Sequence, residues 1–461
     1  MYWANFLHIY QPPTQKAFWI KKIANESYRV LIRGLKANRR AKITLNVNAG
    51  LTELFARHGG RDIITDLAGL AKRGQVEFTG SAKYHPFLPL IPAGEIQRQI
   101  ELNTATNKKF FGTVYQPKGF FPPEMGYSRK VADVARSLGF TWIVIDELAH
   151  TGTMDDTRWD TLYTLKGAED FVVFFRDRNT SFRILSAEVG ISIYSKGMLI
   201  KLLGDRLRSD EYLLTAMDGE TFGHHRPGLD LLLFELYTVP ELKPVTLTEL
   251  TTTVVERTPV EPLDSSWALM KKDLEQKTPF ARWNDEQNEI HKMQWRLTAL
   301  AIASVAKLDP THKDYPNVRA ALDRSLHSDQ YWWASASPWW SIEMIEAGAK
   351  ELRDVVQANP TADGGQKAEA QRLYQDIVFT AFDWQRSDKI HELARASDED
   401  ITQRITTELP FIPVEEFTGI VKNLERQMLT AAKNKEYERA AQIRDRIREL
   451  EEKKDQITTK H

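Results

Sequence analysis

The chain of 461 residues contains no cysteine, and this absence excludes several kinds of protein at once. Disulfide bonds and thiolate catalysis are impossible, and a zinc site would have to use histidine and carboxylate ligands. Long hydrophobic runs are also missing, so the sequence predicts no membrane-spanning helix. The first residues, MYWANFLHIYQPP, lack the basic and apolar segments of a signal peptide. We therefore expect a soluble, cytoplasmic protein.

An excess of charge is absent as well, because 62 Lys and Arg residues face 63 Asp and Glu residues. Such a chain has no overall basic field that would attract nucleic acid, and we expect no nucleic-acid partner. Neither a G-x-G-x-x-G fingerprint nor a P-loop occurs, which argues against nucleotide binding. Aromatic residues, in contrast, are abundant, with 12 Trp, 14 Tyr and 21 Phe. They could fill the core or form platforms that stack on sugar rings or bases.

Strand-like and helix-like segments alternate along the first half of the chain, which predicts parallel βαβ units. We expect strands at 2–9, 43–48, 75–80, 140–146, 171–175, 182–184 and in the run before Asp218, and helices at 16–39, 61–72, 94–110, 127–137 and 196–207. Ionisable side chains lie at or just past several strand ends: His8, Glu77, Glu124, Asp146 and Asp218. A β/α barrel gathers such residues on the face that carries active sites, and an open doubly wound sheet gathers them at one edge.

The second half has a different organisation. Residues 239–265 are rich in Thr and Pro and read as largely irregular with a strand or two, and helical patterns dominate from about 285 to 400. ELPFIPVEE (408–416) is a plausible linker because it holds two prolines. Beyond it, two short apolar stripes at helical spacing predict a helical hairpin. We expect three units, at residues 1–284, 285–408 and 415–455.

Two isolated acids, Glu124 and Asp218, follow apolar strands and have aromatic neighbours. Hydrolysis of a glycosidic bond requires two carboxyl groups facing the scissile bond, and an apolar surround can keep one of them protonated. Each acid could instead cap a helix or pair with a nearby arginine. Histidines could join Asp218 in a metal site, but the adjacent His224 and His225 are a weak signal because neighbouring side chains rarely point into the same site.

The stretch HSDQYWWASASPWW (327–340) carries four tryptophans. They could pack between helices, or they could form a sugar platform on which Asp329 binds hydroxyl groups. Three serines and one aspartate beside the tryptophans favour the platform.

Five motifs in order resemble those of glycoside hydrolase family 57, whose members act on α-glucans through a (β/α)7 barrel followed by a helical subdomain. Two positions depart from the family pattern: Tyr10 replaces the second His of H-x-H-Q-P, and His225 replaces the last Trp of D-x-E-x-F-G-x-W. The matching stretches are residues 8–12 (HIYQP), 74–92 (GQVEFTGSAKYHPFLPLIP), 119–128 (GFFPPEMGYS), 218–225 (DGETFGHH) and 327–332 (HSDQYW).

The resemblance implies a (β/α)7 pseudo-TIM barrel and a retaining mechanism that needs neither a metal nor another cofactor. It implies that Glu124 is the nucleophile and Asp218 the acid/base. It also implies a sugar-binding set of His8, Gln11, Glu77, His85, Glu220, His225, Asp329 and Trp332. We expect amylase-type hydrolysis of α-1,4-linked glucans, or a 4-α-glucanotransferase that shares the same covalent intermediate. The alternatives are a glycan-binding or regulatory protein without turnover, and a metal-dependent hydrolase that uses Asp218 with His8 or His224.

Residues 420–453 resemble the UVR motif, which joins subunits in excision-repair proteins and occurs in some bacterial stress-response adaptors. The resemblance implies contact with a protein partner or self-association through the apolar stripes of residues 415–455. It does not imply DNA repair, because nothing else in the chain points to nucleic acid. The hairpin could also pack on its own barrel.

Overall fold

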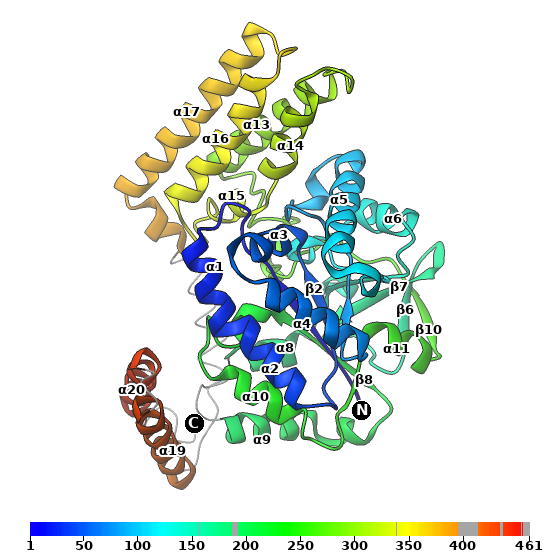
Figure 1. The fold of residues 1–461 in the computed structure, drawn as a ribbon, viewed down its shortest axis with the longest axis vertical. Coiled ribbons are helices and arrows are strands. Elements are labelled where there is room, and N and C mark those ends of the chain that lie inside the picture. Colours follow the sequence, from blue (N-terminus) through cyan, green and yellow to red (C-terminus); the bar gives the residue numbers. More distant parts are fainter. Residues whose placement is uncertain are drawn as a thin grey trace.

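The computed structural model describes residues 1–154, 156–186, 192–337, 339–394, 414–433, 437–452 and 454, and it confirms the alternation of strands and helices in the first half. Figure 1 shows a β/α part, a stack of long helices beside one end of it, and a separate C-terminal hairpin. The strands are β1 (Tyr2–Ile9), β2 (Ile43–Val47), β3 (Val76–Phe78), β4 (Gly119–Phe120), β5 (Trp142–Asp146), β6 (Leu162–Leu165), β7 (Ala168–Arg176), β8 (Tyr212–Asp218), β9 (Lys243–Val245) and β10 (Arg257–Val260).

These strands form two sheets whose edges meet. One sheet has the order β3-β2-β1-β8, with β9 also paired to β1, and the other has the order β10-β6-β7-β5-β4. Gly80 N donates to Gly119 O at 2.8 Å, next to β3 and β4, and Asp177 N donates to Leu214 O at 2.7 Å, next to β7 and β8. Strands β1, β2, β3, β4, β5, β7 and β8 therefore curl into the predicted (β/α)7 pseudo-TIM barrel, whereas β6 runs antiparallel to β7.

Strand β5 illustrates why these segments become strands. Its sequence WIVID is buried throughout. Trp142 and Val144 pack inside the barrel with Phe6, while Ile143 and Ile145 pack in the outer layer beneath the helices. A parallel strand covered on both faces needs such a continuous apolar run, since alternate residues point to opposite sides.

Helices surround the strands, and short turns connect them. The helices are α1 (Ala17–Ile23), α2 (Arg29–Ala37), α3 (Ala49–His58), α4 (Arg61–Lys72), α5 (Ala93–Phe111), α6 (Arg129–Ser137), α7 (Leu148–Thr151), α8 (Arg178–Ser186), α9 (Ser192–Leu203), α10 (Leu229–Leu236), α11 (Leu247–Thr253) and α12 (Lys271–Glu275). The turns are the π-helical η1 (Ala24–Tyr28) and the 3₁₀ turns η2 (Leu88–Leu90), η3 (Gly112–Val114), η4 (Pro123–Met125), η5 (Gly204–Arg208) and η6 (Gly219–Thr221).

One prediction about local structure was wrong, and another was incomplete. The strand expected at 182–184 lies inside α8, because a short apolar run fits a helix as well as a strand. Asp177 favours the helix, since its carboxylate accepts from Thr180 N at 2.8 Å at the start of α8. The segment 239–265 has the two strands that were expected, β9 and β10, but it also contains the unpredicted α11, which begins with a capping box between Thr246 and Glu249.

The helical region begins with α13 and has its own apolar core. Its helices are α13 (Glu289–Ala306), α14 (Tyr315–Ser325), α15 (Asp329–Trp332), α16 (Ile342–Ala358) and α17 (Gly364–Arg386). Ion pairs join α14 to α5 of the barrel: Arg319 lies 2.6 Å from Glu95, and Arg98 lies 2.7 Å from Asp323. The helical region is therefore fixed to the barrel by largely buried charges as well as by apolar contact.

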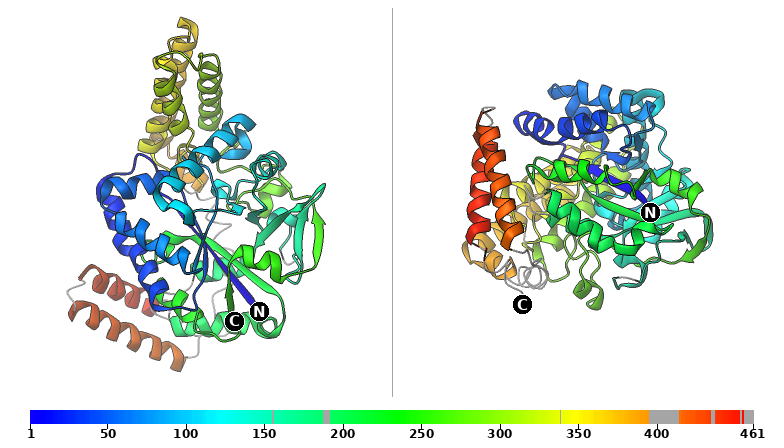
Figure 2. Two further views of the ribbon diagram at one scale, coloured as in Figure 1. Left: turned by 45° about the vertical axis from the view of Figure 1, so that its right-hand side comes forward. Right: turned by 90° about the horizontal axis from the view of Figure 1, so that it is seen from below.

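The C-terminal hairpin consists of α19 (Val414–Lys433) and α20 (Tyr437–Glu452), as the apolar stripes predicted. Phe417, Leu424, Ile443 and Leu450 bury their side chains in its small core. Figure 2 shows the hairpin at the edge of the molecule in both views. Of the predicted linker at 408–416, residues 408–413 lie outside the described residues, and the boundaries of the three predicted units stay predictions. Among the described residues, no helix is both long and apolar enough to cross a membrane.

Gly119 offers a test of the barrel packing, because it lies beside Trp142 in the parallel register of β4 and β5. A Cβ atom at residue 119 would lie 2.0 Å from the buried Trp142 ring. We expect Gly119→Ala to lower the free energy of unfolding by about 1–3 kcal/mol, as overpacking does, when measured by urea denaturation. Gly94→Ala is the control, since nothing lies within 4 Å of its Cβ position. Equal stability of Gly119→Ala and wild type would contradict this packing.

Candidate active site

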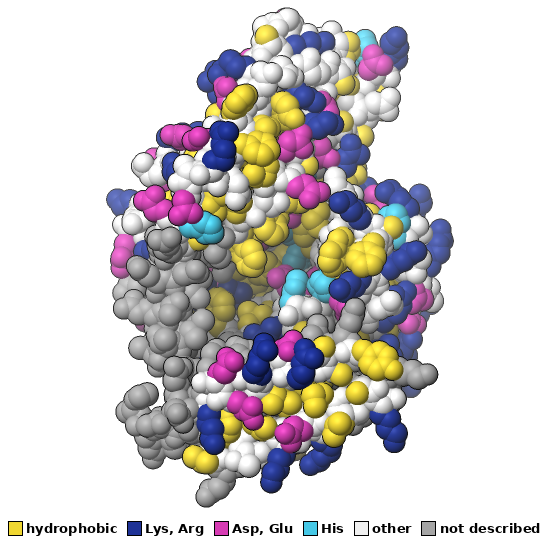
Figure 3. Space-filling view, turned by 90° about the vertical axis from the view of Figure 1, so that its left-hand side faces the viewer, with side chains coloured by type: hydrophobic (Ala, Val, Ile, Leu, Met, Phe, Trp, Pro, Cys, Tyr) yellow, Lys and Arg dark blue, Asp and Glu magenta, His cyan; other side chains and the backbone are white. Residues whose placement is uncertain are grey.

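The register of the central strands brings the first groups of the site together. Strand β1 pairs with β8 so that His8 lies beside Asp218, and with β2 so that His8 lies beside Asn46. All three residues lie at or near the carboxyl ends of their strands, on the side of the barrel that faces the helical region. Figure 3 shows the molecule hollowed below that region, with histidine and carboxylate side chains in the hollow and hydrophobic side chains around it.

Glu124 enters this hollow from a strained turn. Its backbone φ is 62° and that of Met125 is 48°, in the left-handed region that residues other than glycine rarely adopt. The preceding residues Pro122 and Pro123 restrict the chain, and Glu124 O accepts a hydrogen bond from Trp267 N at 3.0 Å. Strain of this kind persists only where the surroundings impose it, so the fold holds the Glu124 side chain in a defined direction.

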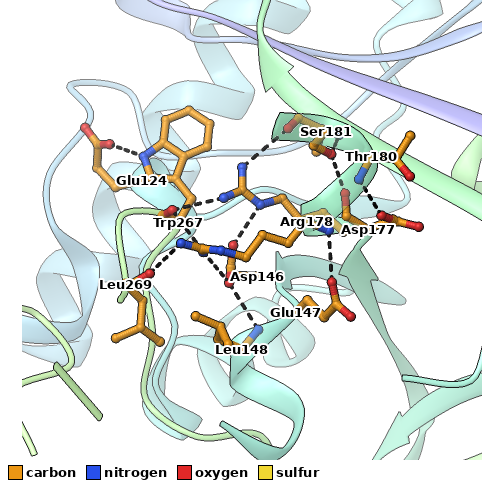
Figure 4. Close-up of polar contacts among 12 residues, drawn as sticks. Glu124, Asp146, Glu147, Leu148, Asp177, Arg178, Thr180, Ser181, Trp267 and Leu269 are labelled. Atoms are coloured by element: carbon orange, nitrogen blue, oxygen red, sulfur yellow. Dashed lines mark hydrogen bonds and ion pairs between the residues drawn. The ribbon is translucent and has the colours of Figure 1, made fainter. Parts of the chain in front are cut away.

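The carboxyl group of Glu124 has donors at both oxygens. Trp267 Nε1 donates to Oε2 at 2.7 Å, as Figure 4 shows. The Ser328 hydroxyl lies 3.3 Å from Oε1, and His85 Nδ1 lies 3.6 Å from the same atom. Burial and the nearby Asp218 and Asp329 raise the pKa of Glu124, while the hydrogen bonds from Trp267 and Ser328 oppose that rise.

Asp218 is the second carboxyl group, at the last position of β8. Burial raises its pKa, and the guanidinium of Arg176 opposes the rise. No hydrogen bond to its side chain is found among the described residues. An indole N–H can only donate, so it favours the ionised form of Glu124. Both pKa values are raised, so the two carboxyl groups hold a proton between them near neutral pH, and the Trp267 indole favours the state in which Glu124 is the ionised member.

A pair of neutral histidines lines the site beside these acids. His8 Nε2 and His85 Nε2 are 3.1 Å apart, so the pair shares one hydrogen bond. His8 Nδ1 lies 2.8 Å from Asn46 Oδ1, and His85 Nδ1 lies 3.0 Å from the Ser328 hydroxyl. Burial lowers the pKa of His8 to about 4 and that of His85 well below its ordinary value. Both rings are therefore uncharged, and each of their four nitrogens has a hydrogen-bonding partner in the protein.

Tyr10 takes a definite place in this group, although it departs from the family motif. Its hydroxyl donates to Asp329 Oδ2 at 2.6 Å, and its ring stacks on His85 with centroids 3.9 Å apart. His327 Nδ1 lies 3.1 Å from the same carboxylate oxygen, and His327 Nε2 lies 3.5 Å from Glu351. Burial disfavours the charged imidazole, but these two carboxylates outweigh it and raise the pKa of His327 to about 9.

Glu220 lies beneath the site in η6 and is buried. Its Oε1 accepts from the hydroxyl of Tyr28, from Tyr10 N at 3.1 Å and from Gln11 Nε2 at 3.5 Å. Burial and the neighbouring Asp218 raise the pKa of Glu220. Glu220 and Gln11 thus join the loops after β1 and β8.

Three of the predicted sugar-binding residues have no hydrogen bond or ion pair with the two acids among the described residues, although Trp332 packs in the same aromatic cluster as Trp267. Glu77 is one layer deeper in the barrel, level with Phe6, where it accepts from Thr44 Oγ1 at 3.0 Å and Thr248 N at 3.2 Å. His225 is exposed, with its ring 5.0 Å from that of His224. Trp332 is half-buried, with its ring 5.1 Å from Trp283 and 6.2 Å from Trp339.

Sequence reasoning missed several residues that shape the site. Trp267 and Ser328 both contact Glu124, but nothing in their local sequence indicates that they meet a residue more than a hundred positions away. Arg176 could have been found, because it ends the apolar strand β7 as Asp146 ends β5. Within the described ranges, no group of three or more His, Asp or Glu side chains is arranged to hold a metal ion.

A β/α barrel with two half-buried carboxyl groups at its strand ends, one hydrogen-bonded and one open, has the features of a glycoside hydrolase. The model of glycosyl hydrolase family 57 matches residues 4–257, just over half of the chain, and the chain belongs to that family. The UvrB/uvrC motif matches residues 418–453. Both resemblances inferred from the sequence are confirmed.

Two of the similar proteins are an alpha-amylase and a 4-alpha-glucanotransferase. The chain is 25% identical over 238 residues to an alpha-amylase of Pyrococcus horikoshii, covering 50% of this chain and 36% of that protein. It is 25% identical over 180 residues to a 4-alpha-glucanotransferase of Thermococcus litoralis, covering 39% of this chain and 27% of that protein. The chain thus spans only about a quarter to a third of the length of these relatives.

The fold resembles that of solved enzymes. A GH57 branching enzyme from Thermococcus kodakaraensis has a TM-score of 0.65 at 17% identity, with 83% of this chain and 96% of that chain covered. The 4-alpha-glucanotransferase structure from T. litoralis has a TM-score of 0.58 at 18% identity, with 77% and 58% covered. At these identities the likeness shows the fold, and it extends beyond the barrel into the helical region.

His327 makes the stability of the wall between barrel and helices dependent on pH. Its pKa in the folded protein is about 9, above the ordinary 6.5, so the stability that it adds is complete below about pH 6.5 and is lost as pH rises through 9. We expect the loss of unfolding free energy in His327→Gln to be larger at about pH 6 than at about pH 10 by up to about 3 kcal/mol. Urea denaturation at fixed salt measures it.

His391→Gln is the matched control, because His391 is exposed on the same helical region. Its effect on stability should be small at both pH values. A loss in His327→Gln that does not change with pH would contradict a charged His327 between Asp329 and Glu351.

Proposed function

We propose that the chain is a retaining enzyme that acts on α-1,4-linked glucans, with Glu124 as nucleophile and Asp218 as acid/base. The observation that carries the proposal is the unequal environment of the two carboxyl groups: Trp267 donates to Glu124 at 2.7 Å, and Asp218 lies open beside it. Retaining glycosidases need this difference, because one carboxyl group must be ionised while the other holds a proton. Relatives named alpha-amylase and 4-alpha-glucanotransferase support the substrate class.

In the first half of the reaction, a carboxylate oxygen of Glu124 attacks the anomeric carbon. The bond from that carbon to the leaving oxygen breaks, and Asp218 gives its proton to that oxygen. The product is a glycosyl ester on Glu124 and a free sugar end. Once Glu124 is an ester it carries no charge, so it no longer opposes a negative charge on Asp218. Asp218 is then suited to stay ionised and act as a base.

In the second half, Asp218 takes a proton from the acceptor, and the acceptor oxygen attacks the anomeric carbon to release Glu124. Water as the acceptor gives hydrolysis, which we propose as the main reaction. A sugar hydroxyl as the acceptor gives a 4-α-glucanotransferase, which remains the alternative because both activities occur among the relatives.

The neutral pair His8 and His85 and the carboxylate of Asp329 lie next to Glu124, and we propose that they bind the hydroxyl groups of the sugar at the cleavage point. A sugar hydroxyl would then replace one present partner of a histidine ring, because all four ring nitrogens are hydrogen-bonded within the protein. Trp332 belongs to an aromatic group that could support the next sugar rings by stacking. The sugar-binding roles of Gln11, Glu77, Glu220 and His225 stay predictions.

The hairpin is proposed as a contact module for a protein partner. Its apolar stripes pack on each other between α19 and α20, so a partner would meet the outer surfaces, where Leu429 and Tyr437 are exposed. Self-association through the stripes themselves would require the hairpin to open.

Product analysis with maltoheptaose tests the function. We expect shorter oligosaccharides alone if water is the acceptor, and longer ones beside shorter ones if a sugar is the acceptor. Glu124→Gln and Asp218→Asn should each lose activity by about 10²–10⁴-fold or more, the usual effect of removing a group that takes part in the chemistry. Asp62→Asn, an exposed carboxylate paired with Arg29, is the control and should keep wild-type activity. A wild type that leaves α-glucans intact would overturn the substrate assignment.

A further inference from the structure

A buried ion cluster lies directly behind the two acids. Arg176 Nε donates to Asp146 Oδ2 at 2.7 Å, and Arg178 Nη1 donates to Asp146 Oδ1 at 2.8 Å. The three side chains are at most 4% exposed. One carboxylate thus faces two guanidinium groups, and the trio has an excess of one positive charge. Burying such a charge is costly unless another group compensates it.

The remaining donors of this cluster hold the segment that contacts Glu124. Arg176 Nη2 donates to Trp267 O at 2.9 Å, while Arg178 donates from Nη2 to Leu269 O at 2.6 Å and more weakly from Nη1 to Trp267 O at 3.4 Å. Trp267 in turn donates twice to Glu124, from its indole at 2.7 Å and from its main-chain N–H at 3.0 Å. Figure 4 shows Trp267 between the cluster and Glu124. Trp267 therefore links Arg176 to Glu124, the proposed nucleophile.

Arg176 also reaches the strand of the other acid. Its Nη1 lies 3.4 Å from Ala216 O, two residues before Asp218 on β8. We propose that Arg176 is a positioning residue that serves both carboxyl groups: it orients Glu124 through Trp267, and it is the fixed positive neighbour of Asp218. This inference rests on the proposed roles of the two acids.

The other groups around Asp218 carry no positive charge. They come from four elements: His8 of β1, Tyr28 of η1, Glu124 of η4 and Glu220 of η6. His8 is neutral because burial lowers its pKa to about 4. Among the described residues, Arg176 is thus the cation that lowers the pKa of Asp218, and its own neighbours are Asp146 and Arg178.

Removing the Arg176 charge should shift the pH profile of activity in one direction. The first step requires protonated Asp218, so its pKa sets the high-pH limb of the kcat/KM profile. Without the Arg176 charge that pKa rises, and the limb moves to higher pH. Loss of the Arg176 bond to Trp267 loosens Glu124 and lowers kcat at every pH.

The test compares Arg176→Met with Arg178→Met, which removes a guanidinium from the same cluster and leaves the same neutral pair with Asp146. We expect Arg176→Met to move the high-pH limb up by about one unit, a factor of about ten in the proton dissociation constant. Arg178→Met should reduce activity without moving the limb. Arg176→Lys should leave the high-pH limb in place, because the positive charge stays. It should lower kcat, because lysine lacks the guanidinium group that hydrogen-bonds Trp267.

A double-mutant cycle tests the route to Glu124 even if Arg176→Met does not fold. Trp267→Phe removes the indole donor, and adding Arg176→Lys to it should lower kcat by less than Arg176→Lys lowers it in wild type. If the wild type is active, any of three results would overturn the inference. They are a high-pH limb that does not move in Arg176→Met, equal shifts of the limb in Arg176→Met and Arg178→Met, and additive losses of kcat in the double-mutant cycle. A wild type that is inactive on α-glucans would instead overturn the proposed function.

Discussion

The electrostatic repulsion between two carboxyl groups buried in one hollow is the constraint on which the rest of the site depends. Glu124 and Asp218 raise the free energy of each other's ionised form, and burial adds to it. The surrounding groups offset this repulsion in different ways. Trp267 donates to Glu124, and Arg176 supplies a positive charge near Asp218. Burial keeps the nearby histidines at residues 8 and 85 neutral, so they add no positive charge beside the two carboxyl groups.

The site belongs to the barrel and the helical region together. His85 O accepts from Ser328 N at 2.9 Å, and Pro86 pairs with His327 in a short antiparallel bridge. These contacts bring Ser328 and Asp329 to the mouth of a barrel whose strands end more than a hundred residues earlier. The charged pairs between α5 and α14 hold the same junction from outside. Because Asp329 is ionised beside charged His327, the wall opposite the barrel also contributes a fixed negative charge to the hollow.

Much of this arrangement could be predicted from the sequence, because it depends on local patterns. Helix α4 was predicted at 61–72 and has these bounds, since its apolar spacing is regular and Gly74 follows it. The acids at strand ends were found because parallel strands present their carboxyl ends on one face. The role of Trp267 was not predictable, since its contact with Glu124 joins segments far apart in sequence. The depth of Glu77 in the barrel depends on strand register, which apolar alternation alone does not fix.

The most direct measurement of the central claim is the identification of the residue that becomes bonded to sugar. A 5-fluoro-α-glucosyl fluoride reacts with a retaining enzyme to form a slowly hydrolysed glycosyl ester, and peptide mass spectrometry locates it. The account predicts one added sugar on the peptide that contains Glu124, with loss of activity in proportion to labelling, and no label in Glu124→Gln. A label on a different carboxylate, or an enzyme that turns over α-glucans without ever forming the ester, would contradict it.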